Sequence, residues 1–127
     1  MSREEFIEVY QRCFEKVSMK YSWALTEDYD EDLEVYVDAQ GNIFIKDIKL
    51  PYHCKNITRV KYRNYEYDEY DEESYILIKF DNNDFLQLGE SGYMDYIHLY
   101  VNNEEGPKSY QDKSAYEYLK KKEESLS

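Results

Sequence analysis

The sequence predicts an α+β protein: a mostly antiparallel sheet of five or six strands, flanked by an N-terminal and a C-terminal helix. Apolar residues near the start recur at helical spacing, whereas the middle of the chain alternates with period 2. Turn sequences separate consecutive strands directly, which is typical of hairpins and argues against parallel β-α-β units. The 127 residues suffice for one core, so we expect a single domain over residues 1–127.

A first helix is predicted over residues 3–21. Ser2 and Glu5 have the spacing of a capping box, in which the serine hydroxyl accepts a hydrogen bond from the first helical turn. One apolar stripe follows the helical period. Its members are Phe6, Ile7, Tyr10, Cys13, Phe14 and Val17.

A first hairpin is predicted from the alternation over residues 33–37, a turn at 39–42 and a returning strand from 43–45. Gly41 supplies the positive φ that such a turn often needs. Pro51 is expected to break the pattern, because proline cannot donate to a strand ladder.

A second hairpin is centred on residues 75–80, the strongest strand candidate. Residues 81–84 have turn chemistry, and 85–88 form the returning strand. Residues 57–67 are a weaker strand candidate, since charges interrupt their β-branched and aromatic residues.

All four glycines are expected at turns, and Gly89 and Gly92 bracket one of them. Residues 97–101 predict a last strand with one solvent-facing side, which would carry His98. Residues 107–109 are expected to introduce the C-terminal helix.

The motif content argues against an enzyme. The chain has no glycine-rich phosphate loop, no GxSxG, HExxH or CxxC motif and only two histidines, so we expect no cofactor and no metal. Its longest apolar run is far shorter than the roughly 20 residues of a membrane span, and it opens without an apolar signal segment. We therefore expect a cytoplasmic protein with reduced cysteines.

One constellation leaves an alternative open. His53 and Cys54 are adjacent, and His98 with Asp47 could complete a metal site or a Cys–His couple. The spacing matches no zinc pattern, and the simpler interpretation is a loop pair beside a proline with His98 facing solvent. A small enzyme or ligand-binding domain using the His53, Cys54 and His98 region stays the alternative from a different class, with Tyr36 and Tyr100 beside His98 on a solvent-facing sheet surface.

Charge is the most informative feature, with 16 basic and 28 acidic residues and a formal net charge of −12. Residues 27–38 carry seven acidic and no basic residues, and residues 64–105 carry 12 acidic and one basic. Residues 39–63 between them carry six basic residues and one acidic residue. This net charge disfavours direct binding to nucleic acid or to an anionic membrane.

In each of the stretches 27–34 and 66–73, six of eight residues are acidic, and three of the four other residues in the two stretches are tyrosines. Charge runs are usually solvated loops, but tyrosine is enriched at interfaces. Carboxylates on one strand face repeat at about 6.6–6.8 Å, roughly twice the 3.4 Å rise of phosphates along a DNA strand, and they accept the same arginine and lysine contacts.

We therefore expect a non-catalytic inhibitor that occupies the nucleic-acid groove of a basic protein, such as a nuclease. The size and composition resemble, in a generic way, phage-encoded DNA-mimic inhibitors of restriction or CRISPR nucleases, and equally immunity proteins that neutralise nuclease toxins. The chain contains no sequence motif of either group, so the resemblance assigns no role to any residue. The expected partner contacts are Asp30, Glu31, Asp32, Tyr65, Glu66, Tyr67, Asp68, Glu69, Tyr70, Asp71 and Glu72.

Overall fold

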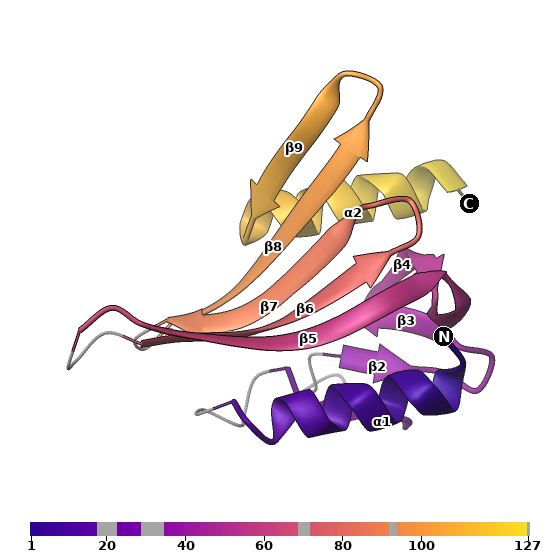
Figure 1. Ribbon diagram of the computed structural model, residues 1–127. Helices are drawn as coiled ribbons and strands as arrows, with labels where there is room; N and C mark the ends of the chain where they lie inside the picture. Colours follow the sequence, from indigo (N-terminus) through magenta and orange to yellow (C-terminus); the bar gives the residue numbers. More distant parts are fainter. Residues whose placement is uncertain (18–22, 29–34, 69–71, 92–93, 127) are drawn as a thin grey trace.

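A computed structural model confirms the α+β class and adds a second sheet (Figure 1). The structure describes residues 1–17, 23–28, 35–68, 72–91 and 94–126. Within these residues a four-stranded sheet has the order β1-β2-β3-β4, and a five-stranded sheet has the order β5-β6-β7-β8-β9. The elements are α1 (Arg3–Phe14), β1 (Leu25–Thr26), β2 (Val35–Val37), β3 (Asn42–Ile45), β4 (Ile48–His53), the short 3₁₀ helix η1 (Cys54–Asn56), β5 (Ile57–Glu66), β6 (Glu72–Phe80), β7 (Phe85–Ser91), β8 (Met94–Asn103), β9 (Gly106–Gln111) and α2 (Lys113–Leu126).

Helix α1 begins as predicted and ends earlier. The Ser2 hydroxyl accepts a hydrogen bond from the backbone N–H of Glu5 at 3.1 Å, which confirms the cap. After Phe14 the backbone N–H groups of Lys16 and Val17 bond three residues back instead of four, so the helix tightens and stops. The predicted continuation over 18–21 lies outside the described residues. On the predicted apolar stripe, Phe6, Tyr10, Cys13 and Val17 are buried.

The four-stranded sheet contains the predicted hairpin, because β2 and β3 pair antiparallel and Gly41 has φ +89° at the turn. The predicted break at Pro51 is wrong, because this residue lies inside β4. Strand β4 is an edge strand, and its register with β3 shifts between Asn42 and Phe44. Proline is tolerated at such an edge, where its missing N–H is not needed for pairing.

The five-stranded sheet is an antiparallel meander that includes the predicted β6–β7 hairpin and its turn at 81–84. The weaker candidate at 57–67 forms a strand of ten residues, β5. The predicted C-terminal helix is confirmed as α2, but its predicted start near residues 107–109 is wrong, since these residues lie in β9 and α2 begins only at Lys113. Strand β9 is again an edge strand, which accommodates Pro107.

Gly89 was expected at a turn and instead lies within β7, whereas Gly92 lies outside the described residues. A Cβ atom on Gly89 would lie 2.5 Å from the Cζ and hydroxyl oxygen of Tyr96 and 2.8 Å from the Cβ of Tyr75. The residue is therefore glycine because an aromatic ring from β8 covers this strand position.

One face of the five-stranded sheet forms the core. The inner face packs its aliphatic side chains against α1, α2 and the four-stranded sheet (Figure 1). The Tyr10 hydroxyl donates to the Trp23 carbonyl at 2.5 Å, and the Trp23 indole N–H donates to the Gly89 carbonyl at 3.1 Å, which links α1 to β7. Among the described helices, none is both long enough and apolar enough to cross a membrane.

The outer face of the same sheet is open. Its described side chains are exposed or half-buried except at Gly89 and His98. Strand register therefore decides which polar side chains meet on the surface.

Candidate functional site

The register gathers the described residues of the stretch 66–73, together with Glu90 and Asp95, at one end of the five-stranded sheet. Glu66 pairs with Glu72, Glu73 with Ser91, and Ser91 with Met94, so the β5–β6 and β7–β8 ends lie side by side. We call the described residues 64–68, 72–74, 90–91 and 94–96 the acidic end. It contains no lysine or arginine. Five of its carboxylates are exposed or half-buried, namely Glu66, Asp68, Glu72, Glu73 and Asp95, whereas Glu90 is only 5% exposed.

The acidic end also carries exposed apolar surface. Tyr65, Tyr67 and Met94 are 49%, 66% and 71% exposed, and they are the exposed large hydrophobic side chains among the residues that the structure describes. In Figure 1 the described chain at the end of β5 extends at the left, away from both termini. A protruding surface with aromatic anchors and surrounding charge has the composition of a protein interface.

Local contacts order this end of the sheet. The Asn64 side chain donates to Glu72 at 2.6 Å and to the Ser74 hydroxyl at 2.9 Å, which joins β5 to β6. The Tyr67 hydroxyl donates to Glu73 at 3.3 Å, and the charge of Glu73 raises the pKa of Tyr67. These contacts hold two of the carboxylates in place on paired strands.

Five of the expected contact residues therefore lie at the acidic end. They are Tyr65, Glu66, Tyr67, Asp68 and Glu72. The other six lie outside the described residues, so their placement stays a prediction. They are Asp30, Glu31, Asp32, Glu69, Tyr70 and Asp71.

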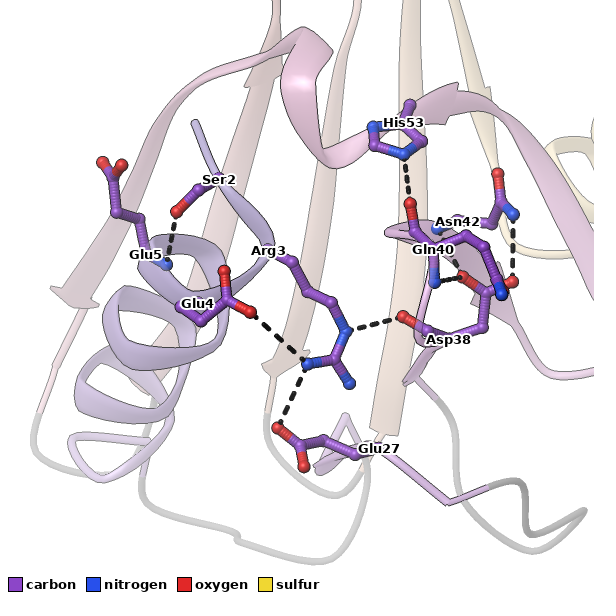
Figure 2. Close-up of polar contacts among 9 residues, drawn as sticks. All are labelled: Ser2, Arg3, Glu4, Glu5, Glu27, Asp38, Gln40, Asn42 and His53. Carbon is purple, nitrogen blue, oxygen red and sulfur yellow. Dashed lines mark hydrogen bonds and ion pairs between the residues drawn. The ribbon is translucent and has the colours of Figure 1, made fainter.

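The described flanks of the first acidic block lie beside the start of α1 (Figure 2). The Arg3 guanidinium donates to the Asp38 carbonyl at 2.6 Å and lies 3.7 Å from the carboxylate of Glu27. The Asp38 carboxylate turns inward and accepts hydrogen bonds from the backbone N–H groups of Gln40 and Asn42. Partial burial acts to raise the pKa of Asp38, but the hydrogen bonds from Asn42 and the turn backbone outweigh it and hold this pKa below its ordinary value. Asp38 is thus part of the β2–β3 turn.

The residues of the enzyme alternative do not converge in the described part of the chain, where no group of three potential ligands could hold a metal ion. His53 Nε2 contacts the Gln40 carbonyl at 2.5 Å, and its Nδ1 accepts the Lys55 backbone N–H at 3.0 Å (Figure 2). Cys54 is fully buried, and burial raises the pKa of its thiol to about 11, which disfavours a thiolate nucleophile. Asp47 accepts hydrogen bonds from Tyr116 and Lys120 of α2.

His98 does not face solvent as expected, because it is only 7% exposed. Its ring stacks on Tyr100 at 4.0 Å, and the Gln111 amide lies 3.2 Å from Nδ1. Burial lowers the pKa of His98, although the charge of Asp112 opposes this shift. Tyr36 lies in the other sheet, so the expected shared surface with His98 and Tyr100 is also wrong.

Two hollows were not predicted. The larger, about 730 Å³, lies between α2 and the ends of both sheets and has the size of a small-molecule pocket. Three of its lining residues, Trp23, Lys46 and Asp112, have positive φ angles of 33°, 57° and 50°. Finding it from the sequence would require the packing of α2 against β4, which no local pattern indicates.

The second hollow, about 400 Å³, lies on the outer face of the five-stranded sheet near the β6–β7 turn. We call it the cationic groove, because four of its lining residues are basic and none is acidic. It is lined by Arg59, Lys61, Arg63, Leu77, Lys79, Asn83, Phe85 and Asn102. The alternation of basic residues at 59, 61 and 63 is a sequence signal for its longest side.

Comparison with protein-family models, with curated proteins and with solved structures found no match to this chain. Function must therefore be inferred from the surfaces themselves.

Proposed function

We propose that this protein is a non-catalytic inhibitor that binds a basic, nucleic-acid-binding protein through the acidic end and blocks its nucleic-acid groove. One observation carries the proposal: five exposed or half-buried carboxylates share one end of the sheet with exposed Tyr65, Tyr67 and Met94. The carboxylates would replace phosphates as acceptors for arginine and lysine, and the exposed side chains would supply the buried anchors. We expect this to take place in the cytoplasm.

The mechanism would be competition. Concentrated negative charge speeds encounter with a cationic groove, and the tyrosines slow dissociation once water is excluded around them. Because the charges are exposed, affinity should fall steeply as salt rises.

An immunity protein that plugs the active site of one toxin nuclease is the second candidate. A plug presents its charge around one convex tip, whereas a DNA mimic presents it in a long row. The gathering of the described carboxylates at one end of the sheet favours the plug.

The test is inhibition of a panel of restriction, CRISPR-effector and toxin nucleases by the wild-type protein and by a Glu66→Gln/Glu72→Gln/Tyr67→Ala variant. The matched control, Glu8→Gln/Glu117→Gln/Tyr116→Ala, makes the same changes on the two helices. We expect the first variant to lose inhibition of the nuclease that the wild type blocks, while the control retains it. Equal inhibition by both variants, or an affinity unchanged by salt, would refute the proposal.

Nucleic-acid binding by the inhibited nuclease separates the two candidates. A mimic displaces the nucleic acid, whereas a plug can stop cleavage while the nucleic acid stays bound.

A further inference from the structure

The cationic groove is an unusual surface for a chain with a net charge of −12. Arg59, Lys61 and Arg63 alternate along β5 and therefore share one face, with neighbours about 6.6–6.8 Å apart. Lys79 of β6 pairs directly with Arg59 and adds a fourth cation beside the row. The register thus builds a row of positive charge from residues on two strands.

This charge is not neutralised within the described part of the molecule, where none of these four side chains forms an ion pair. The pKa of Lys61 is lowered by its partial desolvation and then by the charges of Arg59 and Arg63. Like charges held this close repel one another, and an anion in the groove would relieve the repulsion.

The rest of the lining suits a strand of nucleotides better than a single small anion. Phe85 stacks on Tyr100 at 4.3 Å, so aromatic surface lies beside the cations on the same sheet face. Asn83 and Asn102 add amides at the groove end. Antiparallel sheets that present cations and aromatic rings together are a common platform for single-stranded nucleic acid, because the rings stack on bases while the cations contact phosphates.

The acidic end adjoins the groove at Arg63 but does not forbid such binding. Residues 64–66 of β5 belong to the acidic end, whereas the groove extends from Arg63 toward the β6–β7 turn. Arg59 lies about 13 Å along β5 from Arg63, so the far half of the groove is more than a Debye length of about 8–10 Å from the acidic end and is largely screened from it. The overall negative charge should lower the affinity without reversing the local attraction.

We propose that the cationic groove binds a single strand of nucleic acid, with Arg59, Lys61 and Arg63 on phosphates along the strand, Lys79 beside Arg59 on a further phosphate, and Phe85 against a base. This binding goes beyond the proposed function and uses a different surface. If four phosphates are contacted, the slope of log K against log salt should be about −2.8, so affinity falls roughly 50-fold between 50 and 200 mM salt.

The test is the fluorescence anisotropy of a labelled oligothymidine of about 12 nucleotides in about 50 mM salt. Lys61→Ala/Arg63→Ala should weaken binding by about 10-fold or more, because two charged contacts are lost. Lys113→Ala/Lys121→Ala removes the same charge from α2 and should change binding by less than about 2-fold. Phe85→Leu keeps an apolar side chain in place and should cost about 5-fold or more if a base stacks there.

Several outcomes would overturn the inference. These are no binding in low salt, equal losses from the groove and α2 variants, or no effect of Phe85→Leu. Tighter binding of a duplex or of a polyglutamate peptide than of oligothymidine would assign the groove to another anion. Circular dichroism and thermal unfolding of each variant separate lost binding from lost folding, and none of these results depends on nuclease inhibition by the acidic end.

Discussion

Replacing Asp84 by alanine should remove a buried polar junction between the two sheets. Asp84 is 1% exposed, and its carboxylate accepts hydrogen bonds from the Tyr52 hydroxyl of β4, from the Asn102 backbone N–H of β8 at 2.8 Å and from the Asn82 side chain at 3.0 Å. Burial, followed by the hydrogen bond and charge of Asp84, raises the pKa of Tyr52, so this phenol stays protonated and donates.

The magnitude follows from which donors lose their acceptor. Hydrogen bonds to a charged group contribute about 1.5–3 kcal/mol each. Asn82 is exposed and can bond to water after the substitution, whereas Tyr52 is buried and the Asn102 N–H is partly buried. Counting these two donors, we expect Asp84→Ala to lower the free energy of unfolding by about 3–6 kcal/mol.

Urea unfolding followed by the fluorescence of Trp23, the one tryptophan in the chain, measures this loss. Asp81→Ala is the matched control, because that exposed carboxylate of the same turn bonds the Asn56 side chain at the surface, and it should cost less than about 1 kcal/mol. Tyr52→Phe keeps the ring that stacks on Phe80 at 3.8 Å, so a double-mutant cycle with Asp84→Ala isolates the hydroxyl–carboxylate bond. Equal losses from Asp84→Ala and Asp81→Ala, or a coupling energy near zero, would refute this reasoning.

Three further outcomes are expected. Gly41→Ala should lower the free energy of unfolding by about 1–3 kcal/mol, because Gly41 has φ +89° and an added Cβ would lie 2.7 Å from the His53 ring. Gly106→Ala is the control, because Gly106 has φ +110° but no neighbour within 4 Å of an added Cβ, and thermal unfolding should show a smaller loss of stability. An equal loss from both variants would show that the His53 contact does not matter. Gly89→Ala should cost about 1–3 kcal/mol through its clash with Tyr96, and a Gly89→Ala/Tyr96→Ala variant that recovers none of the clash energy in a double-mutant cycle would contradict the explanation. Because burial holds the pKa of His98 below 6.5, the unfolded chain binds a proton first as pH falls below about 6.5, and the free energy of unfolding should decline from there toward the lower folded-state pKa. His98→Gln should flatten this decline in urea titrations between about pH 5 and 7, and an unchanged slope would assign it to other groups.

Local sequence patterns predict most of the helices and strands, but they rarely predict which of these elements lie side by side. The cap at Ser2, the β2–β3 turn at Gly41 and the β6–β7 turn depend on residues close in sequence, and the structure confirms them. Pro51 and Pro107 were misinterpreted because a proline interrupts a strand only where its N–H is needed, and edge position is set by the whole sheet.

The surfaces show the same limit. A charge count finds an acidic block, but only the pairing of Glu73 with Ser91, and of Ser91 with Met94, brings β7 and β8 to the same end. The cationic groove combines residues of four strands and a turn, so its formation depends on the pairing of strands that are far apart in the sequence. The alternation over residues 97–101 predicts an exposed His98, but this pattern cannot show that Tyr100 and Gln111 contact its ring.

The edges of the two sheets bear on how this protein can be recognised. Strand β1 has two residues, β4 and β9 contain Pro51 and Pro107, and β5 carries a row of like charges. Such features oppose the addition of a foreign strand to a sheet edge. Copies of the chain should therefore resist assembly into fibres through backbone hydrogen bonding between edge strands. A partner would have to bind the side chains on the sheet surface instead of adding a strand to a sheet edge.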